Sequence, residues 1–158
     1  MIKQDKVTIY TDGAAKGNPG KAGWGAVFLV NDKVIEIGGG VEHATNNQME
    51  LTAPIEALKH IKNKFSNIRH IEIISDSKYV ILGITEWILG WRKNNWRNAN
   101  RRPVLNRELW EELHELNEEL KPKWIYVKGH NEDKWNDRAD LIATSFAEGE
   151  PVKLKDAR

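Results

Sequence analysis

Val7-Thr8-Ile9-Tyr10-Thr11-Asp12 is the first segment of the sequence with a clear secondary-structure pattern. Apolar and polar residues alternate along it, which is the pattern of a half-buried strand, and Gly13 is expected to end that strand. Two further stretches, 24–30 and 34–40, have the composition of strands, and the turn-forming residues 31–33 join them. The chain is therefore expected to open with three antiparallel strands.

Beyond Ala44 the hydrophobic pattern indicates helices alternating with strands. Residues 48–65 place apolar side chains on one helical face, and the run Thr45-Asn46-Asn47 offers N-caps. A buried strand follows at 71–75, then a helix at 79–91 with a weak point at Gly83, a helix at 109–120, a strand at 124–128 and a last helix over 139–146. A strand–helix–strand order implies parallel pairing with a right-handed crossover. The sequence thus predicts the α/β class: one mixed, five-stranded sheet, three antiparallel strands then two parallel, flanked by helices.

The composition predicts one domain and excludes several kinds of site. The 158 residues fit a single domain, 1–158, whose polar tail at 148–158 is expected to fray. Lys+Arg 24 against Asp+Glu 23 gives a net charge of +1, which excludes a uniformly basic nucleic-acid coat. The absence of cysteine excludes disulfides and thiol nucleophiles, so a metal would bind oxygen or imidazole. No apolar run is long enough to cross a bilayer, and the N-terminus lacks a signal segment, so we expect a cytoplasmic protein without membrane contact.

Two carboxylates, Asp12 and Asp76, directly follow apolar strands. Taken singly, each has an ordinary structural interpretation, Asp12 in a turn and Asp76 as a helix N-cap. Open α/β sheets, however, bind ligands beyond the carboxyl ends of their strands. Two carboxylates that converge there repel each other unless a cation lies between them, and hard divalent ions such as Mg²⁺ prefer oxygen ligands. The pair therefore predicts a divalent metal site.

Three other residues are candidates for the same site. Glu50, near the start of the first helix, is equally explained as a capping-box glutamate, and Asp140 as a favourable charge near the start of the last helix. Position alone does not select Asp140 over Asp133 or Asp137. His130 follows the fifth strand; a loop histidine is usually solvated, but one beside a carboxylate cluster is a candidate proton carrier at neutral pH.

Amide side chains and a basic segment indicate nucleic-acid contact. The glycines of residues 17–25 precede a strand and lack dinucleotide or Walker spacing, so they are not a phosphate loop. The side chains of Asn18, Asn46 and Asn47 can donate to and accept from a ribose 2′-hydroxyl, although turn and cap roles also explain them. Residues 87–107 contain no acidic side chain, and tryptophans and cations are interleaved there, which suits a nucleic-acid backbone but also a solvated charged face. The tryptophans are Trp87, Trp91 and Trp96, and the cations are Arg92, Lys93, Arg97, Arg101, Arg102 and Arg107.

The chain also contains an ordered series of short motifs. These are Thr11-Asp12-Gly13, Gly17-Asn18-Pro19-Gly20, Thr45-Asn46-Asn47-Gln48-Met49-Glu50-Leu51, Ser75-Asp76-Ser77, Val127-Lys128-Gly129-His130 and Asn136-Asp137-Arg138-Ala139-Asp140. Their order and spacing, from about Val7 to Ala147, resemble those of ribonuclease H of the bacterial type 1 class. The segment 87–106 resembles the basic protrusion of bacterial members.

The resemblance implies a ribonuclease H-like fold and endonucleolytic cleavage of the RNA strand of an RNA/DNA hybrid, with 5′-phosphate and 3′-hydroxyl ends. Two Mg²⁺ ions would take part, with Mn²⁺ as a substitute, and His130 would move protons or assist product release. The implied metal-binding carboxylates are Asp12, Glu50, Asp76 and Asp140.

The resemblance also implies substrate contacts. Asn18, Asn46 and Asn47 would contact ribose 2′-hydroxyls and Thr45 a DNA phosphate, and the protrusion would bind through Trp87, Arg92 and Lys93. Lys78 and Gly90 stand where a bacterial relative has glutamine and asparagine. These two departures affect the substrate contacts and leave the metal set unchanged.

Two other functions are compatible with parts of the sequence. A non-catalytic module that binds hybrids needs only the basic segment, but its four carboxylates would then repel one another without a use. A polynucleotidyl transferase of similar fold would act on a DNA duplex, whereas the pair Asn46-Asn47 favours a protein that contacts 2′-hydroxyls. We expect a monomer whose partner is an RNA/DNA hybrid.

Overall fold

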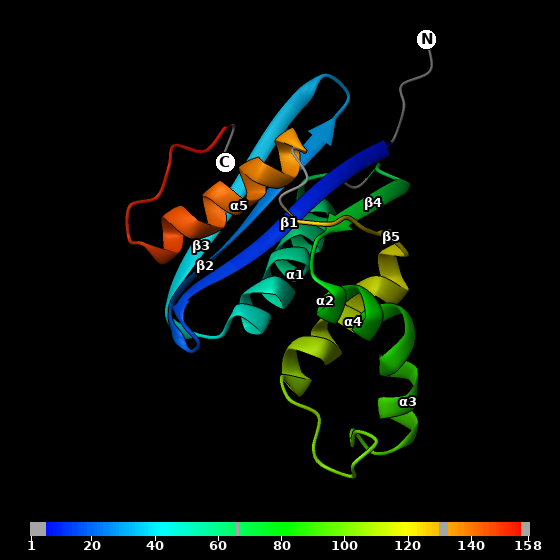
Figure 1. The fold of residues 1–158 in the computed structure, drawn as a ribbon. Helices are drawn as coiled ribbons and strands as arrows, with labels where there is room; N and C mark the ends of the chain where they lie inside the picture. The colour runs from blue at the N-terminus through cyan, green and yellow to red at the C-terminus, as the bar shows by residue number, and fades with distance from the viewer. Residues whose placement is uncertain (1–5, 66, 130–132, 156–158) are drawn as a thin grey trace.

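A mixed sheet forms the centre of the computed structural model, which describes residues 6–65, 67–129 and 133–155 (Figure 1). Within these residues five strands follow the order β3-β2-β1-β4-β5. β2 pairs antiparallel with β1 and β3, and β4 pairs parallel with β1 and β5, so the predicted α/β class and sheet are confirmed. The strands are β1 (Lys6–Gly17), β2 (Gly20–Val30), β3 (Lys33–Ala44), β4 (His70–Ser75) and β5 (Lys123–Tyr126).

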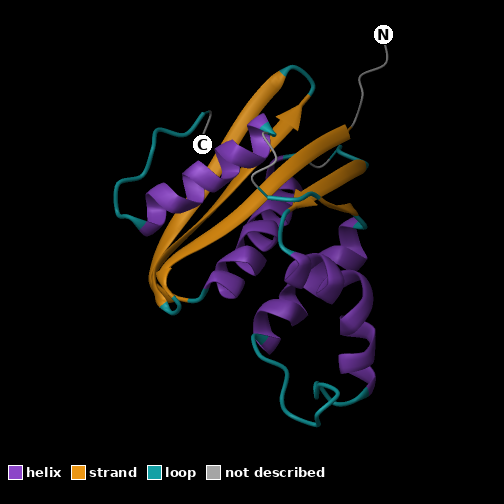
Figure 2. Ribbon diagram, in the orientation of Figure 1, coloured by secondary structure: helices purple, strands orange, loops and turns teal. Residues whose placement is uncertain are grey.

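Helices cover both faces of the sheet (Figure 2). The alternation along β1 explains this arrangement: Val7 and Ile9 belong to a large core that includes residues of α1 and α4, whereas Tyr10 packs with residues of α5 on the opposite face. The helical elements are α1 (Asn46–Lys64), α2 (Lys78–Leu82), the π-helix η1 (Gly83–Trp87), α3 (Ile88–Lys93), α4 (Arg107–Leu120) and α5 (Lys134–Ala147).

β1 continues to Gly17, so the prediction that it ends at Gly13 is wrong. The cause is backbone pairing, because Gly13 opposes Trp24 and Gly17 opposes Gly20 in the antiparallel ladder with β2. The small residues after Asp12 show no apolar alternation that could have revealed this extension. Asp12 therefore lies inside a paired strand and not in a turn.

The helix predicted over 79–91 is divided into α2, η1 and α3, and the hydrogen-bonding pattern changes at Gly83, as the sequence suggested. A Cβ on Gly83 would overlap the ring of Trp110, which is fully buried in α4. The glycine therefore allows α4 to pack directly against the π-helical turn. This contact fixes the base of the segment 87–106, which we call the protrusion.

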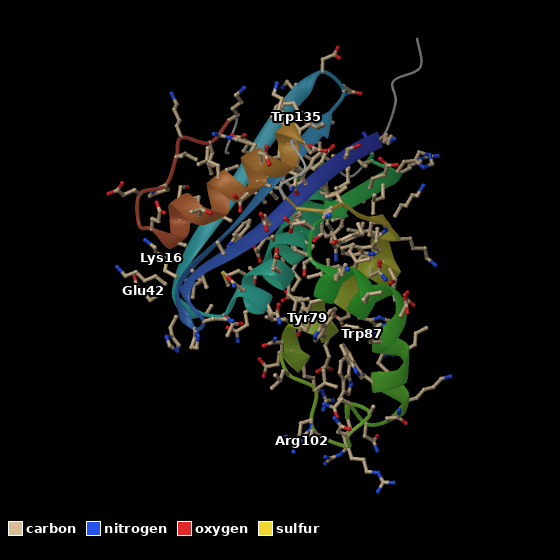
Figure 3. The ribbon with its side chains drawn as sticks, viewed as in Figure 1. Lys16, Glu42, Tyr79, Trp87, Arg102 and Trp135 are labelled. Atoms are coloured by element: carbon tan, nitrogen blue, oxygen red, sulfur yellow. The ribbon has the colours of Figure 1, made fainter. Side chains whose placement is uncertain are left out.

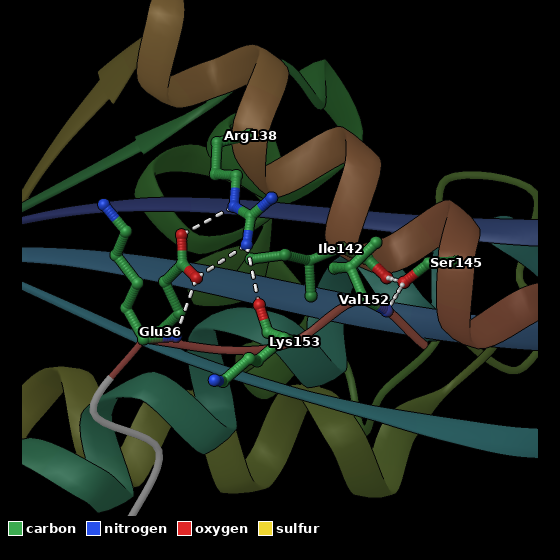
Figure 4. A network of polar contacts seen from close by, with 7 residues as sticks. Glu36, Arg138, Ile142, Ser145, Val152 and Lys153 are labelled. Carbon is green, nitrogen blue, oxygen red and sulfur yellow. Dashed lines mark hydrogen bonds and ion pairs between the residues drawn. The ribbon is translucent and has the colours of Figure 1, made fainter. Parts of the chain in front are cut away.

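The tail after α5 makes specific hydrogen bonds over residues 150–155, where the sequence led us to expect fraying. Val152 N donates to Ser145 Oγ at 3.1 Å. Two bonds join Lys155 to Glu36: Glu36 N donates to Lys155 O at 2.8 Å, and Lys155 N donates to Glu36 Oε1 at 2.9 Å. Arg138 holds the buried Glu36 carboxylate through two bonds of 2.7 and 2.9 Å and donates to the Lys153 carbonyl at 3.0 Å (Figure 4). Burial of a charge requires such partners, and here the tail supplies some of them.

Among the residues that the structure describes, no helix has the length and apolar character needed to span a membrane.

Candidate active site

Three carboxylates converge at one edge of the sheet. Asp12 comes from β1, Glu50 from α1 and Asp76 from the residue after β4, and one oxygen of each lies within 4.8 Å of the other two. Asp12 is 4% exposed, so the cluster lies at the boundary of the core and not on the open surface. Asp12 and Asp76, which the sequence predicted to converge, therefore lie close together, and Glu50 lies beside them.

The backbone brings these residues together for two reasons. Thr11 pairs with Ser75 in the parallel ladder between β1 and β4, so Asp12 and Asp76 are the next residues at the same end of neighbouring strands. Gly13 then allows α1 to approach β1, because a Cβ there would lie only 2.5 Å from Glu50 N. A side chain at position 13 would push α1, and Glu50 with it, away from Asp12.

The capping roles proposed as alternatives belong to other residues. Thr45 caps α1 and Gln48 completes the capping box, so Glu50 is not the capping-box residue. Ser77 Oγ accepts from Val80 N at the start of α2, which leaves the Asp76 carboxylate outside the cap. Asp133 caps α5. The carboxylates at 50, 76 and 140 are therefore available for another use.

Asp140 approaches the cluster on α5. A Cβ on Gly25, the residue opposite Asp12 on β2, would lie 2.9 Å from Ala139 O and 2.7 Å from Ile142 Cγ2, so this glycine allows close packing of α5 on the sheet. Burial is the largest cause of the raised pKa values of Asp12, Glu50 and Asp76, and the negative charge of Asp140 raises each of them further. Asp140 is not one of the three residues, Asp12, Glu50 and Asp76, whose carboxylate oxygens lie within 4.8 Å of one another.

The electrostatics of the cluster are those of an uncompensated anionic site. Burial raises the pKa of Asp12, and the charges of Glu50 and Asp76 raise it further. Burial, followed by the charge of Asp76, raises the pKa of Glu50, and its buried Oε1 has no hydrogen-bond partner in the described part of the chain. Burial also raises the pKa of Asp76. Converging carboxylates with an unpaired buried oxygen are the donor set that a hard divalent cation prefers, so these residues fit a bound metal ion.

Asn136 is the site residue that sequence reasoning missed as a separate candidate. It is 2% exposed on α5, and a side-chain hydrogen bond from it lowers the pKa of Asp76, against the effect of burial. The available signal was its position one helical turn before Asp140, which places both residues on the same face of α5.

The predicted substrate residues lie at the start of α1 and around it. Asn18 Oδ1 accepts from Asn46 N at 2.9 Å, which ties the β1–β2 hairpin to the first residue of α1. Asn46 and Asn47 are exposed, whereas the Thr45 hydroxyl accepts from Gln48 N at 3.1 Å. His130 lies outside the described residues. Its neighbour Gly129 lies close to Asp76, because a Cβ there would come within 3.0 Å of Asp76 Oδ2.

Two of the three tryptophans of the protrusion pack inside it, and the third is exposed on its surface. Trp91 makes an edge contact with the buried Trp110 at 5.2 Å between ring centroids and lies 6.4 Å from the Trp96 ring, so these two rings build the segment. Trp87 is 41% exposed, and Arg92 and Lys93 are exposed. Figure 3 shows Arg102 at the end of the protrusion, far from the sheet.

This fold, with its acidic cluster at the ends of two parallel strands, defines an α/β protein with the type of site that metal-dependent hydrolases use. The chain belongs to the RNase H family, whose model matches residues 4–148.

Individual relatives agree with this assignment. The chain is 47% identical over 148 residues to ribonuclease H of Thermosynechococcus vestitus, covering 93% of this chain and 92% of that one. It is 45% identical over 143 residues to ribonuclease HI of Pseudomonas aeruginosa, covering 90% and 94%.

Solved structures show the same fold. RNase H1 from the archaeon Halobacterium salinarum matches with a TM-score of 0.69 and 28% identity over 91% of this chain and 98% of that one. LC11-RNase H1, solved in complex with an RNA/DNA hybrid, matches with a TM-score of 0.69 and 23% identity over 90% and 97%.

Proposed function

We propose that this protein is an endonuclease that hydrolyses the RNA strand of RNA/DNA hybrids, leaving 5′-phosphate and 3′-hydroxyl ends. The observation that supports this most is the cluster of Asp12, Glu50 and Asp76, with its raised pKa values and its unpaired Glu50 oxygen, in a chain of the RNase H family. The relatives bear the name ribonuclease H, and one structural relative was solved with a hybrid bound.

Asp12, Glu50, Asp76 and Asp140 would hold the metal, which we propose to be Mg²⁺, with two ions during catalysis and Mn²⁺ as a substitute. When bound, the metal would lower the pKa of a water molecule and stabilise the charge on the leaving 3′-oxygen. The carboxylates supply the negative charge that retains the cation, and Asn136 orients Asp76 within the set. His130 would carry a proton, so His130→Ala should leave an active enzyme slowed by about 10²- to 10⁴-fold.

The remaining residues would hold the two strands of the hybrid. Asn18, Asn46 and Asn47 present amides at the start of α1, where they can test a strand for 2′-hydroxyls. Thr45 and the protrusion would take the DNA strand, the protrusion through Trp87, Arg92 and Lys93. In this proposal residues 1–158 form a single domain, and the protein acts as a monomer in the cytoplasm.

The test is a cleavage assay with three duplexes of one sequence: RNA/DNA hybrid, double-stranded RNA and double-stranded DNA, each labelled on one strand. We expect Mg²⁺-dependent cutting of the RNA strand of the hybrid alone, abolished by chelator and by Asp76→Asn. Binding without cutting would identify a hybrid-binding module, and cutting of the DNA duplex would identify a transferase-like nuclease.

A further inference from the structure

A series of hydrogen bonds between polar side chains connects the start of α1 with the base of the protrusion. Gln48 Nε2 donates to Asn106 Oδ1 at 3.3 Å, and Asn106 Nδ2 donates to the Tyr79 hydroxyl at 3.1 Å. The same hydroxyl accepts from Trp110 Nε1 at 3.1 Å. The four residues come from α1, from the N-cap position of α4, from α2 and from α4, so the bonds join elements that are separate in the sequence. Figure 3 shows Tyr79 at the junction between α1 and the protrusion.

The use of Asn106 shows that this connection is more than helix capping. Asparagine at an N-cap ordinarily accepts from a backbone N–H of the first helical turn. Asn106 occupies the N-cap of α4 with φ 62°, yet its side chain makes no capping bond there. Both ends of its amide are used between Gln48 and Tyr79 instead. The Asn106 side chain therefore bonds to α1 and α2 and does not cap α4.

At one end the chain of bonds reaches the predicted substrate residues. Gln48 Oε1 accepts from Thr45 N at 2.9 Å, and Thr45 is followed directly by Asn46 and Asn47. A displacement of the Gln48 side chain would therefore be transmitted to the turn that carries these three residues.

At the other end the chain of bonds reaches the aromatic residues of the protrusion. Trp110 is fully buried and lies 5.2 Å from the ring centroids of both Tyr79 and Trp91. Trp91 in turn contacts Trp87 at 6.0 Å. The protrusion is therefore fixed to the same hydroxyl group as the start of α1.

We infer that Gln48, Asn106, Tyr79 and Trp110 act as a positioning unit that sets the spacing between the 45–47 turn and the protrusion, and thereby selects the width of the duplex that is bound. This inference rests on the proposed function, in which those two regions take the two strands of a hybrid. RNA/DNA hybrids differ in groove shape from both double-stranded RNA and double-stranded DNA, so a fixed spacing favours one duplex over the others. None of the four residues belongs to the carboxylate cluster, so the unit affects which duplex is held more than the reaction itself.

The experiment uses two variants with one control in the full chain. Tyr79→Phe removes the shared hydroxyl and leaves the Trp110 and Asn106 donors without an acceptor, whereas Asn106→Gly removes the amide and tolerates φ 62°. The control is Asn117→Ala, which removes an acceptor of Trp124 Nε1 at 2.8 Å toward the far end of α4. This control removes a hydrogen bond of the same kind, a tryptophan Nε1 donor with a side-chain acceptor, at a place away from the two binding regions.

We expect Tyr79→Phe and Asn106→Gly each to raise KM for the hybrid about tenfold, with kcat changed by less than about twofold. The preference for hybrid over the two other duplexes, measured by fluorescence anisotropy in chelator, should fall by about the same factor. Asn117→Ala should lower the melting temperature and leave both quantities unchanged. If the first two variants lower only the melting temperature, or if wild type binds all three duplexes equally, the inference is overturned. Selective binding of hybrid without cutting would refute the proposed function and leave the positioning unit intact.

Discussion

Asp12→Asn should make the metal-free protein more stable while it abolishes cleavage. The three carboxylate oxygens lie within 4.8 Å of one another. At an effective dielectric constant of about 20, two unit charges at this distance repel by about 3.5 kcal/mol. Keeping Asp12 protonated at pH 7 costs 1.36 kcal/mol for each unit above its usual pKa of about 3.9, or about 4 kcal/mol in total. Only one of these penalties applies at a time, because Asp12 is either ionised and repelled or protonated at that cost. An uncharged amide of the same shape avoids either one, so we expect a gain of about 2 to 4 kcal/mol.

The pH dependence gives the sign of this effect independently. Burial, with the charges of Glu50 and Asp76, raises the pKa of Asp12 in the folded protein. The unfolded chain therefore ionises Asp12 first, and the wild type loses stability as pH rises from about 4 toward the folded pKa. Replacement by asparagine removes this loss, so the advantage of the variant should be small near pH 4 and grow toward pH 8.

The assay is a thermal melt of wild type and variant in chelator and in Mg²⁺, at several pH values. A gain of about 2 kcal/mol corresponds to a rise of about 4 to 8 °C for a chain of this size. Mg²⁺ at 100 times its dissociation constant should stabilise the wild type by about 2.7 kcal/mol and the variant much less. Asp32→Asn, at an exposed turn, serves as the control and should have no effect. A variant that melts at or below the wild type in chelator, with equal responses to Mg²⁺, would refute the reasoning.

Three further predictions concern the approach of α1, the bonds to Glu36 and the protrusion. Gly13→Ala should displace Glu50 and lower cleavage by about 10²-fold; wild-type rates would show that the close approach is not needed. Arg138→Ala should destabilise the fold by about 2 to 4 kcal/mol in urea melts at pH 7, because the buried Glu36 carboxylate loses its countercharge and keeps only the bond from Lys155 N. Burial raises the pKa of Glu36, but its bonds to Arg138 and Lys155 outweigh this and hold the pKa below its usual value, so the difference should shrink as pH falls through that lowered pKa; a constant difference would contradict the pairing. Alanine at four cations of the protrusion should weaken hybrid binding and reduce its salt slope by roughly one unit per lost phosphate contact, whereas an unchanged slope would mean that the segment faces solvent. These cations are Arg92, Lys93, Arg101 and Arg102.

The convergence of Asp12 and Asp76 could be predicted because it follows from strand order. Each residue ends an apolar stretch, and parallel neighbours bring their carboxyl ends to one edge. Glu50 could not be separated from a capping residue by this reasoning. The choice between Gln48 and Glu50 as the capping partner depends on the exact residue at which α1 begins, and helix boundaries are the least certain part of a sequence-based prediction.

Other features were hidden because their signal lies in tertiary contacts. Trp91 and Trp96 have the same local composition as the exposed Trp87. Only tertiary contacts distinguish them, because Trp91 packs on the buried Trp110 and Trp96 lies against Trp91. The polar tail gave no sign of its attachment, because Glu36, its main partner, is more than a hundred positions away in the sequence.

The bonds around Glu36 also set an order of events during synthesis. β3 is made early, but the partners of its buried carboxylate are Arg138, the main chain at Lys155 and, through Arg138, the carbonyl of Lys153. A ribosome-bound chain that ends before these residues carries an unpaired charge at a position that the finished protein buries to 1% exposure. The ladder between β2 and β3 can form while translation continues, but β3 gains these partners for Glu36 only after the last of these residues has emerged.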